Sequence, residues 1–141
     1  MKKFAFAGAA VVAVSALAYL ASPRTNAREA APASGTDLVN VTLPDTLSAQ
    51  AQMGKRAFDA VCVACHGTNA AGKDGFGPPL VHVIYEPNHH GDMSFYMAVQ
   101  NGVQAHHWRF GNMPAQDGLT KGDVTTIIAY VRELQRTNGI N

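Results

Sequence analysis

The sequence lacks several features on which common functional classes depend. It has only two cysteines among its 141 residues, and 11 Lys and Arg are balanced by 10 Asp and Glu. After residue 46 the two charge signs are interspersed and no basic stripe remains, which disfavours nucleic acid as a partner. No segment longer than a few residues alternates like a strand, and there is no internal repeat. These absences leave a small helical domain with loops.

The two cysteines lie in one pentapeptide, Cys62-Val63-Ala64-Cys65-His66. Its C-x-x-C-H spacing is that of a c-type haem attachment site. Each thiol can bond covalently to a haem vinyl group, while the adjacent imidazole reaches the iron from the same side. The motif therefore predicts one covalent haem c, with Cys62 and Cys65 as the attachment points.

Other uses of the same cysteines remain open but are less well supported. A redox dithiol normally belongs to a βαβ pattern, which the flanking sequence does not show. A structural zinc site needs a fourth ligand, which another histidine could supply, but the second Cys pair typical of such sites is absent. A simple disulfide is the remaining alternative. Neither dithiol interpretation explains a histidine directly after the second cysteine.

The N-terminus predicts export. Lys2 and Lys3 precede an uncharged, mostly apolar run from residue 4 to residue 21, as in a secretory signal. The run is longer than a usual signal core and just reaches the length of a membrane-spanning helix. Residues 1–21 are thus either a signal peptide, cleaved near Ala27, or an uncleaved membrane anchor. In both cases we expect a periplasmic protein, either soluble or tethered to the inner membrane.

Residues 22–46 are rich in Pro, Ala, Ser and Thr, which predicts a flexible tether between the N-terminal segment and a folded domain at 47–141. The alternative is a partly ordered extension that lies on the domain. Its possible contacts are Leu38, Val39, Val41 and Leu43.

Helical periodicity predicts three helices in this domain. The first covers about 48–63, so haem attachment falls at its C-terminal end, and the second covers 92–101. The third begins near Thr120, where Asp123 follows with the spacing of a capping box, and Gly139 ends it. It places Val124, Ile127, Ile128, Val131 and Leu134 on one face. Residues 67–91 are dense in Gly and Pro and predict loop. The fold class is therefore all-α, with so small a core that a buried porphyrin would help to fill it.

Four sequence pieces together resemble the class I (mono-haem) c-type cytochromes over about residues 48–138. They are Gly54 and Phe58 ahead of the C-x-x-C-H motif, the loop Gly77-Pro78-Pro79-Leu80, the segment Gly111-Asn112-Met113-Pro114, and the C-terminal helix. Their order along the chain matches that family. The resemblance is more specific than the pentapeptide alone.

The resemblance implies a set of roles for these residues. His66 is the proximal iron ligand and Met113 the distal one, and Pro78 or, alternatively, Pro79 offers a backbone carbonyl to the free ring nitrogen of His66. The helix that carries Gly54 and Phe58 is expected to cross the one that carries Ile127 and Tyr130. A His/Met ligand pair raises the reduction potential, which suits electron transfer.

The remaining methionines and histidines need a separate interpretation. Met53, Met93 and Met97 lie in or beside helical patterns and are predicted to be packing residues. Between the two proposed ligands are five histidines: His82, His89, His90, His106 and His107. We expect most of them at the surface or hydrogen-bonded to loop backbone and haem propionates. A second metal site and an alternative iron ligand are further possibilities. Trp108 is either a core residue or a propionate donor.

The function that follows is single-electron transfer rather than catalysis. We expect an exported mono-haem cytochrome c that carries electrons between redox protein partners, a reductase or dehydrogenase on one side and an oxidase on the other. The alternative is a haem-bearing subunit or sensor of a larger membrane or periplasmic oxidoreductase complex.

Overall fold

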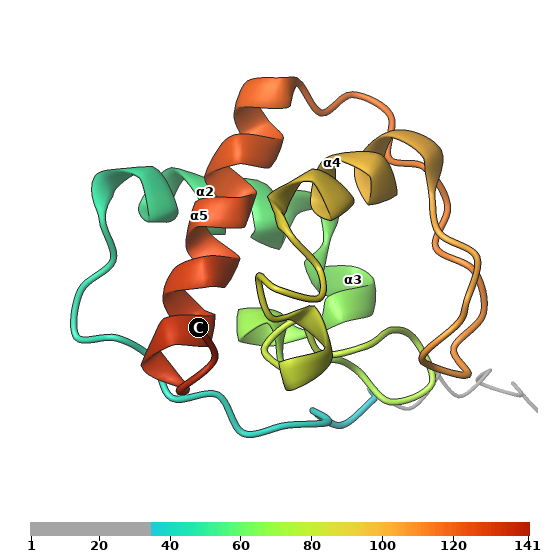
Figure 1. Ribbon diagram of the computed structural model, residues 1–141, viewed down its shortest axis with the longest axis horizontal. Coiled ribbons are helices and arrows are strands. Elements are labelled where there is room, and N and C mark those ends of the chain that lie inside the picture. Colours follow the sequence, from blue (N-terminus) through green and yellow to red (C-terminus); the bar gives the residue numbers. More distant parts are fainter. Residues whose placement is uncertain (1–34) are drawn as a thin grey trace, which may run out of the picture. The chain divides into compact units, whose positions relative to one another are not determined.

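The structure is a computed structural model, which describes residues 35–141. Within these residues the chain forms helices and loops without a sheet (Figure 1), so the all-α prediction is confirmed. The elements are α2 (Ala49–Val61), α3 (Val63–His66), η1 (Thr68–Ala70), η2 (Val83–Tyr85), α4 (Asp92–Asn101) and α5 (Lys121–Thr137). Two isolated bridges, Lys73 with Gly77 and Val103 with Met113, are the only strand-like pairings in the described part.

The helix ends follow local sequence chemistry. The hydroxyl of Ser48 accepts a hydrogen bond from the Ala51 N–H and begins α2. Thr120 and Asp123 form a reciprocal capping box that begins α5. Gly139, with φ of 77°, follows its last turn. The first helix was expected to run unbroken over about 48–63. In the structure it ends at Val61, and after Cys62 a separate short helix, α3, begins at Val63.

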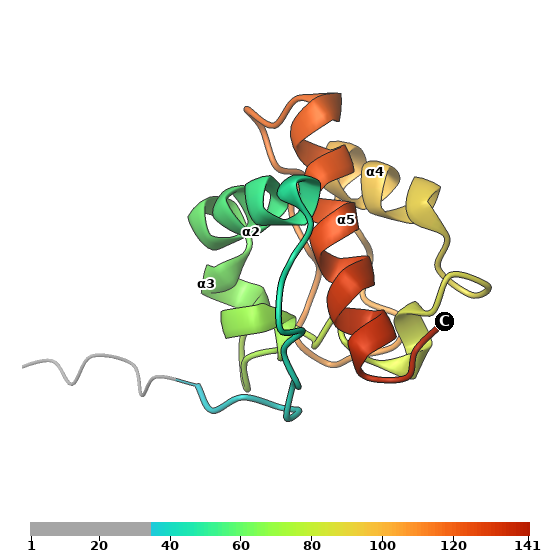
Figure 2. The same cartoon turned by 90° about the vertical axis from the view of Figure 1, so that its left-hand side faces the viewer.

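The core is built where α2 and α5 cross, as Figures 1 and 2 show from two directions. The Phe58 and Tyr130 rings meet edge to face there, with centroids 5.6 Å apart, and both side chains are almost completely buried. Gly54 lies at the closest approach. A Cβ atom at this position would stand 1.8 Å from the Thr126 carbonyl oxygen. The crossing implied by the family resemblance is therefore observed, and it depends on a residue without a side chain.

Replacing Gly54 by alanine is expected to separate the two helices. The added methyl group would collide with rigid backbone of α5, and such overpacking costs about 3 kcal/mol or more, a large share of the stability of a small domain. Thermal unfolding of the purified haem protein measures the effect. Gly122→Ala is the control, because its new Cβ meets nothing closer than the Thr120 hydroxyl at 3.6 Å. Equal stability of the two variants would contradict this account of the crossing.

Burial of Tyr130 gives a second prediction, on alkaline stability. Burial, reinforced by the negative charge of Asp59, raises the pKa of the Tyr130 hydroxyl from 10.0 to about 12. The unfolded chain therefore loses this proton at lower pH than the folded chain does. The contribution of Tyr130 to stability is complete below pH 10 and is lost between about pH 10 and pH 12. Melting temperatures across this range should fall less steeply for Tyr130→Phe than for the parent protein, and parallel curves would refute the assignment.

Residues 35–47 lie along the domain. The amides of Leu38 and Val39 donate to the Ala71 carbonyl, and Thr42 and Asn138 exchange two hydrogen bonds of 2.9 and 2.8 Å. Val41 packs against the core. Part of the segment predicted as a flexible tether, from residue 38 to residue 42, is thus bonded to the domain.

The predicted signal or anchor at residues 1–21 lies outside the described residues. Within 35–141, no helix has the length and apolar character needed to cross a bilayer.

The prediction that three helical methionines are packing residues is wrong. Met53, Met93 and Met97 are 48%, 65% and 51% exposed. The reason is visible in α2, where Ala51, Gly54 and Phe58 share the inward face and helical spacing turns Met53 to the opposite side. The periodicity showed that a helix exists there, but not which stripe faces inward.

Candidate haem site

One cavity brings together the residues that sequence analysis selected. Cys62, Cys65, His66 and Met113 all line it. The first three come from the junction of α2 and α3, whereas Met113 arrives from the loop between α4 and α5. The remaining lining is mostly apolar or backbone: Val61, Phe76, Gly77, Pro78, Phe110, Gly111, Asn112, Pro114 and Gln116. Thiols, an imidazole and a thioether therefore face a common apolar space, as a covalent haem requires.

His66 is held in one tautomer. Its Nδ1 lies 2.9 Å from the carbonyl oxygen of Pro78, which can only accept, so Nδ1 carries the proton and donates it. Burial lowers the pKa of His66 and so favours the neutral ring, whereas the hydrogen bond to Pro78 raises the pKa and partly offsets this effect. The Nε2 lone pair is thereby left for a metal, the usual arrangement around a ligating histidine. The carbonyl of Pro78, rather than that of Pro79, makes this contact.

The cysteine pair does not have the character of a reactive dithiol. Burial, together with the neighbouring Cys65, raises the pKa of the Cys62 thiol from 9.0 to about 11. Redox-active C-x-x-C pairs instead contain a thiol whose pKa is lowered, because the thiolate is the nucleophile. The electrostatics therefore argue against the redox-dithiol alternative.

Met113 is positioned by a turn and a backbone bridge. Its amide and carbonyl exchange hydrogen bonds of 3.0 and 2.9 Å with Val103, and Figure 1 shows the two stretches of this loop running side by side. Gly102 precedes the bridge with φ of 73°, and a Cβ there would stand 2.5 Å from the Met113 carbonyl oxygen. A glycine at 102 is thus required for the backbone that carries Met113 to pass so close.

Trp108 does not line the cavity, but it stacks on Phe110, which does. Its indole Nε1 is buried and has no hydrogen-bond partner within the described residues. The nearby Tyr85 hydroxyl does not supply this partner. Burial raises the pKa of Tyr85 and the Trp108 side chain partly offsets the rise, but the two groups do not meet in hydrogen-bonding geometry. A buried, unpaired N–H is costly, and a haem propionate is a suitable acceptor. The orphaned donor supports the propionate interpretation of Trp108 over a purely apolar role.

Two residues of α5 that sequence reasoning missed hold the loop that leads from Leu80 to the start of α4. Arg132 and Gln135 are buried polar residues on the apolar face of that helix. The Gln135 side-chain amide donates to the carbonyls of Leu80 and Tyr85, at 2.8 and 3.0 Å. Arg132 donates to Tyr85 O, His90 O and the Asp92 carboxylate. The only signal in the sequence was a polar pair, three residues apart, beside positions of the apolar stripe.

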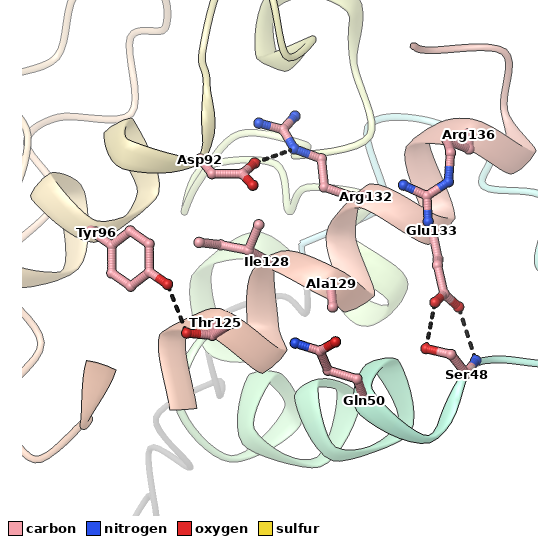
Figure 3. A pocket seen from close by; sticks show the side chains of 10 residues that line it. All are labelled: Ser48, Gln50, Asp92, Tyr96, Thr125, Ile128, Ala129, Arg132, Glu133 and Arg136. Atoms are coloured by element: carbon pink, nitrogen blue, oxygen red, sulfur yellow. Dashed lines mark hydrogen bonds and ion pairs between the residues drawn. The ribbon is translucent and has the colours of Figure 1, made fainter. Parts of the chain in front are cut away.

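A second hollow, between α2, α4 and α5, is of a different kind. Figure 3 shows it lined by paired polar groups: Glu133 accepts from Ser48, Tyr96 meets Thr125 at 2.7 Å, and Arg132 binds Asp92. It contains no cysteine, histidine or methionine. It has no groups suited to a haem, so the site is the cavity at Cys62.

Comparison with known proteins identifies the family. The family model described as "Cytochrome c" matches residues 51–135, more than half of the chain. The protein therefore belongs to the cytochrome c family, which makes it a haem c protein with a role in electron transfer. No solved structure matches the chain significantly.

The curated relatives are longer proteins, and only part of each aligns with this chain. The chain is 30% identical over 89 residues to the "Cytochrome bc1 complex cytochrome c subunit" of Mycobacterium bovis (strain ATCC BAA-935 / AF2122/97). The subunits of the same name from Mycobacterium tuberculosis strains CDC 1551 / Oshkosh and ATCC 25618 / H37Rv match equally. Each alignment covers 62% of this chain but only 29% of the relative. The chain thus spans less than a third of the length of these relatives.

Proposed function

We propose that this protein is a single-haem electron carrier whose iron is bound by His66 and Met113. The observation that carries the proposal is the shared cavity, because two residues 47 positions apart (113 minus 66) line it together with both cysteines. A haem held by these residues would supply one-electron chemistry, and a His/Met pair would raise its potential. Pro78 orients the His66 ring, and Trp108 offers its N–H to a propionate. If His66 and Met113 both bind the iron, a substrate would have no place there, and we propose no enzymatic activity.

The rim of the cavity supports docking of a redox partner. Val61 and Phe76 line the cavity and are 37% and 40% exposed. The segments Gly77–Pro78 and Gly111–Pro114 line the same opening. A small apolar rim without a large net charge suits the weak, transient interfaces through which electron-transfer proteins meet. We propose that the donor and the acceptor both dock at this rim.

A second candidate is a permanent subunit of a larger membrane oxidoreductase. The names of the mycobacterial relatives favour it, since each is a subunit of a cytochrome bc1 complex. Our proposal of export, with residues 1–21 as signal or anchor, is compatible with both candidates. Intact mass of the mature chain and its partition between membrane and soluble fractions decide between cleavage and anchoring.

Purification from the native host separates the carrier from the subunit. Membranes are solubilised in mild detergent, and the haem-stained chain is followed by size-exclusion chromatography. A carrier elutes alone and is reduced and reoxidised by added membrane fractions. Constant co-elution with a catalytic protein in a fixed ratio would contradict the carrier and support the subunit.

A further inference from the structure

The histidines that the haem site does not use are gathered into one cluster. The imidazole rings of His89, His90 and His107 lie with centroids 4.6 to 5.4 Å apart. One ring nitrogen from each lies within 4.8 Å of one nitrogen from each of the others. His106 adds a fourth ring, 4.3 Å from His107 and 6.1 Å from His90. We propose that His89, His90 and His107 form a binding site for a late first-row divalent cation, Zn²⁺ or Cu²⁺, with His106 able to supply a fourth ligand.

The ring of His90 is already oriented as a ligand would be. Its Nδ1 donates to the Ile84 carbonyl at 2.6 Å, which leaves the Nε2 lone pair free. The carbonyl of His90 accepts from the buried Arg132 at 2.6 Å, and its amide donates to Glu86 O at 2.8 Å. Ligating histidines usually have their second nitrogen fixed by a backbone carbonyl in this way. His90 is therefore the rigid member of the site.

The other two rings can move to complete it. His89 and His107 are exposed, and within residues 35–141 no hydrogen bond engages either ring. Tetrahedral binding at Zn–N distances of 2.0–2.1 Å places ligand nitrogens about 3.3 Å apart. The ring nitrogens lie within 4.8 Å of one another, so each pair has to approach by at most about 1.5 Å, which side-chain rotation can provide. Neutral imidazoles favour zinc and copper over magnesium or calcium.

The cation would join two segments that are far apart in sequence. His89 and His90 belong to the turn between η2 and α4, and His106 and His107 belong to the loop that ends at Met113. That loop is anchored at its base by the Val103–Met113 bridge and by the bond from Ala105 N to Asn112 Oδ1. A ligand that binds the folded protein alone stabilises it by mass action. Metal binding is therefore expected to raise the unfolding temperature.

Zinc titration of the haem protein, first treated with a chelator to remove loosely bound divalent cations, tests the site. Calorimetry near neutral pH should give one Zn²⁺ per chain, and zinc should raise the melting temperature. His89→Gln and His107→Gln should each weaken binding by at least about tenfold, the smallest loss expected when even an outer partner of a ligand is removed. The double variant should lose both the binding and the thermal shift. Cu²⁺, on fully oxidised protein, should bind more tightly than Zn²⁺.

Two controls make the result specific. Asn88→Ala changes an exposed neighbour in the same turn, and Met93→Gln changes an exposed side chain at the start of α4; both should bind zinc like the parent. The visible spectrum, recorded in parallel, should stay unchanged, which separates this site from the haem ligands. Zinc binding retained by the double variant would overturn the proposal, as would stoichiometry far below one or a thermal shift of equal size in every variant.

Discussion

Replacing Cys62 and Cys65 together by alanine is expected to abolish covalent retention of haem. Both thiols line the cavity beside His66, and no other cysteine is present in the chain to form a thioether. Acid–organic extraction should remove all haem from the double variant and none from the parent. Haem content per chain in the purified variant should also fall severely, because coordination alone has to hold the group.

The matched control lies between the two cysteines. Ala64 is exposed, so Ala64→Ser changes the motif without touching an attachment point and should keep haem unextractable. Each single cysteine variant should retain one thioether and therefore some covalent haem. Full extraction of haem from the unmodified protein would overturn the attachment, as would unextractable haem in the double variant.

Removal of Met113 is expected to have the second largest effect. Met113→Ala should eliminate the Met–iron charge-transfer band and allow added imidazole to bind the iron. Met113→His should restore six-coordinate iron at a lower potential, because imidazole stabilises ferric iron better than a neutral thioether does. The fall should be on the order of 0.1–0.3 V, a fraction of the ~0.8 V range that axial ligands cover.

Met93 and Met97 supply the comparison for Met113. Both are exposed on α4, at 65% and 51%, and neither lines the haem cavity. Met93→His and Met97→His should leave the charge-transfer band and the potential at their parental values. A band that persists in Met113→Ala, or disappears in Met93→His, would assign the distal ligand elsewhere.

Features with a local cause could be predicted from the sequence. The second helix was expected at 92–101, and α4 occupies the same residues. Its end is set locally, because Gly102 takes a positive φ and stops the helix. The start of α5 follows from Thr120 and Asp123, whose side chains cap it without help from the rest of the fold. The haem motif is local for the same reason, since five consecutive residues supply both attachment points and one ligand.

Features that depend on distant contacts could not be predicted in the same way. Residues 35–46 have the composition of a linker, yet the Ala71 carbonyl and Asn138 hold them against the domain. Nothing in the order of residues indicates that Arg132 and Gln135 reach the turn before α4. The doubled proline left two carbonyls available to His66, and only the folded loop distinguishes Pro78.

The histidine cluster shows the same limit. Two histidine doublets were visible in the sequence, but their separation by α4 gave no reason to bring them together. The structure does so through the turn fixed by Arg132 and the loop closed at Met113. Proximity of the rings is a tertiary property, which is why a cation site was one interpretation among several until the fold was known.

A redox-titrated visible spectrum of the native purified protein tests the central claim most directly, because it reports haem type, ligand set and potential together. We expect the spectrum of one c-type haem, a Met–iron charge-transfer band in the oxidised state, and a single one-electron transition at a potential raised by His/Met ligation. A five-coordinate or bis-histidine spectrum, or stoichiometric zinc in place of haem, would contradict the assignment of His66 and Met113.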